Sequence, residues 1–163
     1  MKKLILLTLL VGNVFAEEIP QEIIEFTIMG TGNNVTIEQV HRSTHINQTI
    51  LGNNNTSVIL QSGNHSKEIN STISGDYNTQ NITQTSNAND LLDVSLVGDH
   101  NSATILQTGH NENSAVIHLE NVGGPSDLSL IQNGNPNACG PTGITQFCAN
   151  PAGCSVAVTQ PAH

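Results

Sequence analysis

A pattern of four residues recurs along the chain every 23 residues. It reads G-x-x-N-x-x-x-I-x-Q and begins at Gly52, Gly75 and Gly98 without a gap. A fourth copy begins at Gly30, one residue out of step, and a degenerate fifth copy begins at Gly123. Repeats of this length are typical of solenoids, in which a single unit cannot bury its apolar face and must stack on its neighbours.

Each repeat contains two short segments in which apolar and polar residues alternate. One segment ends at the motif glutamine, and the other follows a turn, as in Ile69–Ser71–Ile73 and Leu92–Val94–Leu96. Alternation with a period of two predicts strands, and the Gly- and Ser-containing stretches between them predict turns. The sequence therefore predicts an all-β fold, a two-sheet β-solenoid of about five stacked coils of about 23 residues each.

Stacking would align equivalent inward-facing side chains in columns along the solenoid. The predicted apolar column contains Ile37, Ile59, Ile82, Ile105 and Leu130, and two predicted amide ladders contain Gln39, Gln61, Gln84, Gln107 and Gln132, and Asn33, Asn55, Asn78 and Asn101. A buried amide can donate to one neighbouring coil and accept from the other, which avoids an unpaired polar group. The asparagines are expected at turns, where they tolerate left-handed backbone and bond locally.

Composition agrees with a stacked β-structure and argues against other classes. The chain has 163 residues, of which 21 are Asn and 10 are Gln, but only four are aromatic and 10% are charged. Such amide-rich, charge-poor sequences suit ladders between stacked strands. An enzyme core normally uses more aromatic residues, and no catalytic motif is recognisable. We therefore expect no enzymatic activity, no cofactor and no metal site.

The N-terminus predicts secretion. Residues 1–16 combine Lys2 and Lys3 with an apolar stretch and a small residue, Ala16, as in a cleaved signal peptide. This stretch is too short to span a bilayer, and no later one is longer, so membrane insertion is not expected. Without residues 1–16 the chain has two basic and 13 acidic residues, a net charge of −11, which disfavours binding to nucleic acid.

The remaining sequence divides into an acidic and apolar segment, 17–29, the repeats, 30–133, and a tail, 134–163. Whether residues 17–29 cap the first coil is left open. The tail contains Cys139, Cys148 and Cys154, whose spacing fits no common zinc site, so we expect a disulfide among them, with an intermolecular crosslink as an alternative. Four prolines argue against a strand-rich tail, although Cys154–Thr159 is a candidate edge strand.

Two acidic residues, Asp76 and Asp99, follow the motif glycine in neighbouring repeats. Stacking would bring these like charges to about 4.8 Å, where they repel modestly. We interpret them as turn residues that slow premature polymerisation.

The repeats resemble those of the curlins, the subunits of bacterial curli fibres. The similarity is carried by Asn101-Ser-Ala-Thr-Ile-Leu-Gln107 and by Gln107, Gly109, Asn113 and Ala115, with one extra residue between the glycine and the asparagine. It covers residues 30–133. It implies a secreted subunit that polymerises into extracellular functional amyloid, a cell-surface fimbrium or pilus of a Gram-negative bacterium, for adhesion and biofilm matrix.

The implied partners are further copies of the chain, a second curlin subunit and an outer-membrane curli secretion apparatus. The chain departs from the curlin pattern where aliphatic residues such as Ile73, Leu96 and Leu119 replace amides in the second strand of each repeat. The roles of major subunit and of nucleating minor subunit therefore both stay open. The alternative is a monomeric secreted β-solenoid adhesin.

Overall fold

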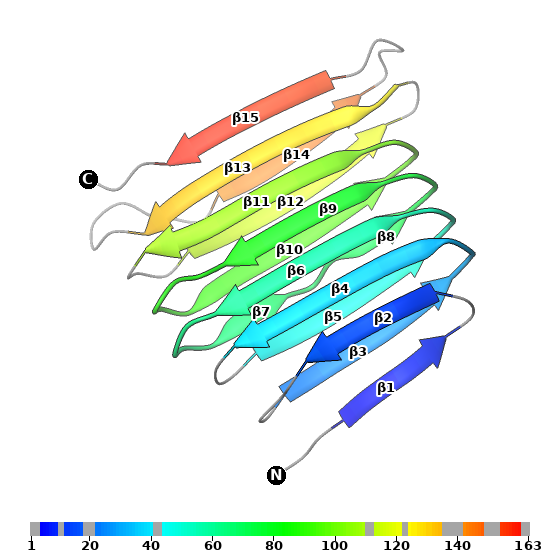
Figure 1. The fold of residues 1–163 in the computed structure, drawn as a ribbon. Helices are drawn as coiled ribbons and strands as arrows, with labels where there is room; N and C mark the ends of the chain where they lie inside the picture. Colours follow the sequence, from blue (N-terminus) through cyan, green and yellow to red (C-terminus); the bar gives the residue numbers. More distant parts are fainter. Residues whose placement is uncertain are drawn as a thin grey trace.

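The computed structural model describes residues 4–9, 12–17, 22–40, 44–109, 113–121, 124–134, 142–148 and 154–160, and the side chains of 24–40, 45–109, 113–121, 124–133 and 154–159. These residues form strands and the turns between them, arranged as two stacked parallel sheets (Figure 1). The predicted all-β, two-sheet solenoid is confirmed, with about four turns of ~23 residues. No helix long and apolar enough to cross a membrane occurs in the described part of the chain.

The two sheets alternate along the chain. Sheet A contains β1 (Leu4–Leu9), β3 (Glu22–Met29), β5 (Thr44–Leu51), β7 (Lys67–Ile69), β8 (Thr72–Ser74), β10 (Asp90–Val97), β12 (Asn113–Asn121) and β14 (Thr142–Cys148). Sheet B contains β2 (Gly12–Glu17), β4 (Asn33–Val40), β6 (Thr56–Ser62), β9 (Thr79–Gln84), β11 (Ser102–Gly109), β13 (Ser126–Gly134) and β15 (Cys154–Gln160). One coil is a strand of sheet A followed by a strand of sheet B. In Figure 1 the coils rise in order from β1 to β15.

The strands of successive coils pair in the register that the 23-residue repeat requires. Every pair of neighbouring strands is parallel, and Thr44, Lys67, Asp90 and Asn113 occupy equivalent positions in successive coils, 23 residues apart. In sheet B the motif isoleucines pair in one line, Ile37 with Ile59, Ile59 with Ile82 and Ile82 with Ile105. Equivalent residues therefore face the same environment in each coil.

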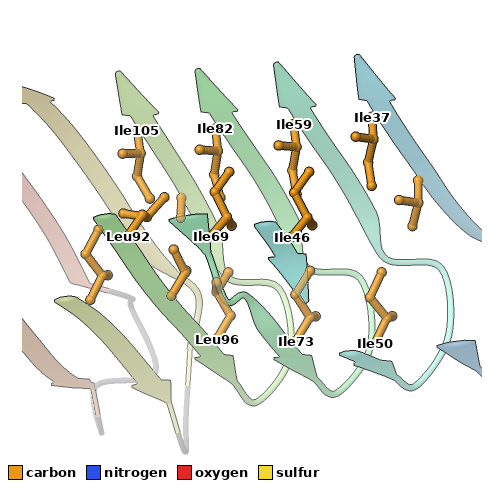
Figure 2. Close-up of a cluster of buried hydrophobic side chains, with 14 of the residues drawn as sticks. Ile37, Ile46, Ile50, Ile59, Ile69, Ile73, Ile82, Leu92, Leu96 and Ile105 are labelled. Carbon is orange, nitrogen blue, oxygen red and sulfur yellow. The ribbon is translucent and has the colours of Figure 1, made fainter. Parts of the chain in front are cut away.

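The core lies between the two sheets. Ile37, Ile59, Ile82, Ile105 and Leu130 are all buried, as are the facing columns of sheet A, which run through Ile46, Ile69 and Leu92 and through Ile50, Ile73 and Leu96. Figure 2 shows these columns side by side, one aliphatic side chain from each coil. Burial of aliphatic side chains that one coil would leave exposed stabilises the stack, by about 1.5–3 kcal/mol for each fully buried Ile or Leu.

The motif glycines permit the close approach of coils at the turns. Gly52 and Gly75 have φ of 119° and 114°. A Cβ added to Gly52 would lie 2.1 Å from the carbonyl oxygen of Gly75, and one on Gly75 would lie 2.3 Å from that of Gly98. No side chain fits between turns stacked this tightly, so glycine is required for the spacing as well as for the backbone angle.

The sheets extend beyond the repeat motif in both directions. Glu22–Met29 is a full strand, β3, whose Ile24, Phe26 and Ile28 belong to the core, so this part of the 17–29 segment is the sheet A strand of a coil with β4. The expectation of a strand-poor tail is wrong, because β14 and β15 pair with β12 and β13. The four prolines of the tail all lie outside the bounds of these two strands, so they do not interrupt the pairing. The structure also pairs β1 and β2 with β3 and β4.

Candidate functional site: ladders and sheet edges

A ladder of buried glutamines runs across sheet B, near the C-terminal ends of its strands. The Nε2 of each donates to the Oε1 of the next: Gln39 to Gln61 at 2.9 Å, Gln61 to Gln84 at 2.9 Å, Gln84 to Gln107 at 2.7 Å and Gln107 to Gln132 at 2.8 Å. Gln61, Gln84, Gln107 and Gln132 are fully buried. Gln61, Gln84 and Gln107 therefore have partners in both neighbouring coils, whereas an unpartnered buried amide would cost about 1–3 kcal/mol.

A ladder of asparagines runs along the opposite end of the same strands. The Oδ1 atoms of Asn33, Asn55 and Asn78 accept the backbone N–H of the next motif asparagine at 2.8–2.9 Å. The Nδ2 atoms of the same three residues donate to the carbonyl oxygen of the motif glycine in the next coil at 2.8 Å. The expectation of local bonds is wrong for these three residues, whose buried side chains bond between coils, whereas Asn101 Nδ2 does donate locally, to the carbonyl oxygen of Val97 at 3.0 Å. Left-handed backbone falls instead on Asn54, Tyr77 and His100, just before the motif asparagine.

The turn carboxylates form a third ladder. Asp99 Oδ1 accepts the backbone N–H of Asp76 at 2.7 Å, and Asp76 Oδ1 accepts the backbone N–H of Asn53 at 2.6 Å. Asn53 Oδ1 in turn accepts the N–H of Thr31 at 2.9 Å. The sequence predicted only repulsion at this position. The structure adds a hydrogen bond from each carboxylate to the turn of the preceding coil, which offsets the repulsion.

A buried ion pair joins β7 and β10, which are neighbouring strands of sheet A. Lys67 Nζ lies 3.2 Å from Asp90 Oδ2, and the two side chains are 1% and 0% exposed. Lys67 also donates to Ser86 Oγ and to the carbonyl oxygen of Ala88, while Asp90 accepts from Ser86 and from the Nδ2 of Asn113. Sequence reasoning missed this pair, since the position lies outside the four-residue motif. The signal available was that Lys67 and Asp90 are 23 residues apart.

The middle of the core is polar in two successive coils. Gln48 Nε2 donates to Ser57 Oγ at 2.6 Å, and Ser71 Oγ donates to Gln80 Oε1 at 2.7 Å. The neighbouring coils place Phe26 with Val35 and Val94 with Ala103 at these positions, so the four polar residues interrupt two apolar columns. Gln48 Oε1 and Gln80 Nε2 are among the buried polar atoms of the described side chains that have no hydrogen-bond partner, so each of these two coils has one unsatisfied amide atom.

The backbone has a consistent direction across the stack. Outward-facing residues donate toward the C-terminal neighbour: the N–H groups of Asn34, Thr56 and Thr79 each bond at 2.8 Å to the carbonyl of the motif asparagine in the next coil. Inward-facing residues donate toward the N-terminal neighbour, as Asp90 does to Ser66 at 3.1 Å. In a parallel sheet, adjacent residues point their backbone groups to opposite sides, so this alternation continues along each strand.

The C-terminal coil continues the columns. β15 places Val156, Val158 and Gln160 in register with Leu128, Leu130 and Gln132. Val156 and Val158 are half-buried and pack against the core. Cys154, the first residue of β15, is disulfide-bonded; the other predicted candidates, Cys139 and Cys148, lie outside the described side chains. Within the described residues, β15 is the last strand of sheet B, so its outer edge is unpaired.

The described residues include no group of three or more His, Cys, Asp or Glu side chains that could hold a metal ion. Comparisons with protein-family models, with curated proteins and with solved structures gave no match for this chain. The ladders and the two ends of the stack are therefore the features of the molecule that indicate a function.

Proposed function

We propose that this chain is a secreted structural subunit that stacks end to end with further copies into extracellular, curli-like amyloid fibres for adhesion and biofilm matrix. The observation that carries the proposal is the match between the outer edge of β15 and the edge of β4 that faces away from β6. Unpaired edges of regular sheets template the addition of further strands. A two-sheet stack that begins at β3 and β4, as in a chain from which residues 1–16 have been removed, offers two such edges at each end.

The backbone groups of the two edges are complementary. By the alternation described above, Ser155, Ala157 and Thr159 point their N–H and carbonyl groups away from β13. The residues that point theirs away from β6 are Val35, Ile37 and Gln39. This is the same relation that joins β11 to β13 within the chain, so a second copy could continue the ladder in parallel register.

The strand register also continues across this junction. Val156, Val158 and Gln160 of one copy would pair with Val35, Ile37 and Gln39 of the next, since both sets occupy the same three register positions. In sheet A, Ile144 would lie opposite Phe26 for the same reason. Secretion across the outer membrane, a second curlin subunit and the Gram-negative cell surface are the parts of the proposal that depend on the resemblance and on the N-terminal segment.

Fibre diffraction and photo-crosslinking test this function together. The chain beginning at Glu17 should form thioflavin-positive fibres with a meridional reflection at about 4.7–4.8 Å. A photo-reactive residue in place of Ser155 should crosslink to the Asn34 region of another copy, while the same group in place of Thr83, in the middle of the stack, should not. A protein that stays monomeric for days at tens of micromolar would contradict the proposal and favour the monomeric adhesin.

A further inference from the structure

We infer that β1 and β2, together called the leader, form an intramolecular cap on the edges at which a second copy would add. The inference rests on the proposed function, because it concerns the same junction. β1 pairs with β3 from Leu4 opposite Ile23 to Leu9 opposite Ile28, and β2 pairs with β4 from Gly12 opposite Asn33 to Glu17 opposite Glu38. Both N-terminal edges of the solenoid are therefore occupied by the chain's own leader.

The leader uses the backbone groups that a second copy would need. The N–H and carbonyl groups of Val35, Ile37 and Gln39 point away from β6 and toward β2. A strand edge accepts one partner on each side, so β2 and the β15 of another copy cannot pair with β4 at the same time. The same exclusion applies in sheet A, where β1 occupies the edge of β3.

The covalent connection favours the leader in this competition. Only four residues, 18–21, separate β2 from β3. Short connections give effective concentrations in the millimolar range, on the order of a hundred times a subunit concentration of tens of micromolar. The edge is therefore held by the leader as long as the chain is intact.

Cleavage at the predicted site would remove the cap in one step. A cut after Ala16 separates all of β1 and all of β2 except Glu17 from the rest of the chain. The β3 and β4 edges would then be exposed together, in the register that β14 and β15 of another copy require. The intact chain would thus be unable to accept a second copy at its N-terminal edges before the leader is removed. Fibre assembly would therefore depend on cleavage of the leader.

Amide hydrogen exchange of the intact chain, read residue by residue by NMR, tests the cap directly. In the full chain the amides of Val35, Ile37 and Gln39 should be protected. The variant Asn13→Pro/Phe15→Pro removes two donors from β2, at the positions opposite Asn34 and Thr36. It should speed exchange at Val35, Ile37 and Gln39 at least tenfold. Thr36 and Glu38 bond to β6 and should not change, so they report that the fold is intact.

The matched control is Leu10→Pro, which places the same residue between the bounds of β1 and β2. It should leave exchange at Val35, Ile37 and Gln39 as slow as in the unmodified chain. The full-length double variant should also form fibres with a lag at least several-fold shorter than that of Leu10→Pro. Equal exchange at the three amides in the double variant and the control would overturn the cap. Failure of the chain beginning at Glu17 to form any fibre would instead overturn the proposed function.

Discussion

Individual buried residues determine which coils can pair as neighbours in the stack. Lys67 and Asp90 are the clearest case, because both charges are removed from water and every polar atom described for them has a partner in the same cluster. The desolvation of such a pair consumes much of its attraction, so its main effect is on specificity: a shift by one coil would bury a charge without its counter-ion. The hydrogen-bonded pair thus fixes which coils are neighbours.

The variant Lys67→Met tests this role of the ion pair. It leaves the Asp90 carboxylate buried without its cation and should lower the free energy of unfolding by about 3–5 kcal/mol. The double variant Lys67→Met/Asp90→Asn should recover most of that loss, since the amide keeps an acceptor for Asn113. Urea unfolding followed by circular dichroism measures both.

The exposed pair of His118 and Glu120 provides the control for this experiment. Its side chains are 39% and 44% exposed, so Glu120→Gln should change stability by less than about 1 kcal/mol. A loss in Lys67→Met no larger than that of Glu120→Gln would contradict the role assigned to the buried pair.

In the turns, repulsion between like charges is opposed by hydrogen bonds from the same carboxylates. Asp76 and Asp99 bring like charges into successive turns, yet each carboxylate accepts the backbone N–H of the turn before it. Exchange of the charge for a neutral amide keeps the acceptor, whereas removal of the side chain leaves the N–H without it. These two effects can be separated by substitution.

The double variant Asp76→Asn/Asp99→Asn should stabilise the solenoid by about 0.2–1 kcal/mol, because the repulsion disappears and the hydrogen bonds remain. Asp76→Ala should destabilise it by about 1–3 kcal/mol, since the N–H of Asn53 loses its acceptor. Thermal unfolding at low and high salt measures both. The gain in the double variant should shrink as salt rises; a gain independent of salt would contradict its electrostatic origin.

The sequence predicted the regular elements well because each prediction rested on the same 23-residue register. The inward columns around Ile59 and Gln61 followed from alternation alone. β14 was missed, since the coil that contains it is longer than the repeat and the prolines around it suggested a tail with no strand except the candidate at Cys154–Thr159. The buried pair of Lys67 and Asp90 was missed because a pair of unlike residues in one column carries no repeated letter.

At the scale of the whole molecule, the two ends of the stack are held by different means. The N-terminal end is covered by β1 and β2, which are connected to the rest through the chain itself. The C-terminal end finishes in β15, whose first residue, Cys154, is in a disulfide. Within the described residues β15 pairs with β13 alone, so we expect the disulfide to add a second constraint on this strand.

Reduction of the full chain should therefore loosen β15 selectively. The amides of Asp127, Ser129 and Ile131 point toward β15 and should exchange about 30-fold faster in dithiothreitol, the equivalent of about 2 kcal/mol of disulfide stabilisation. Leu128 and Leu130 point toward β11 and serve as internal controls. Cys154→Ser should reproduce the effect without reductant. Unchanged exchange at all five amides would contradict a role of the disulfide in docking β15.

The uniform direction of the backbone hydrogen bonds has a consequence for any filament made from this chain. Inward residues present their N–H groups at one end of every coil and outward residues present theirs at the other, so the two ends are chemically unlike. Subunits that stack through these ends must therefore all point in the same direction along the filament. Such a filament is polar, and its two tips are expected to elongate at different rates. The slower tip should be the one whose strand edge is less readily exposed.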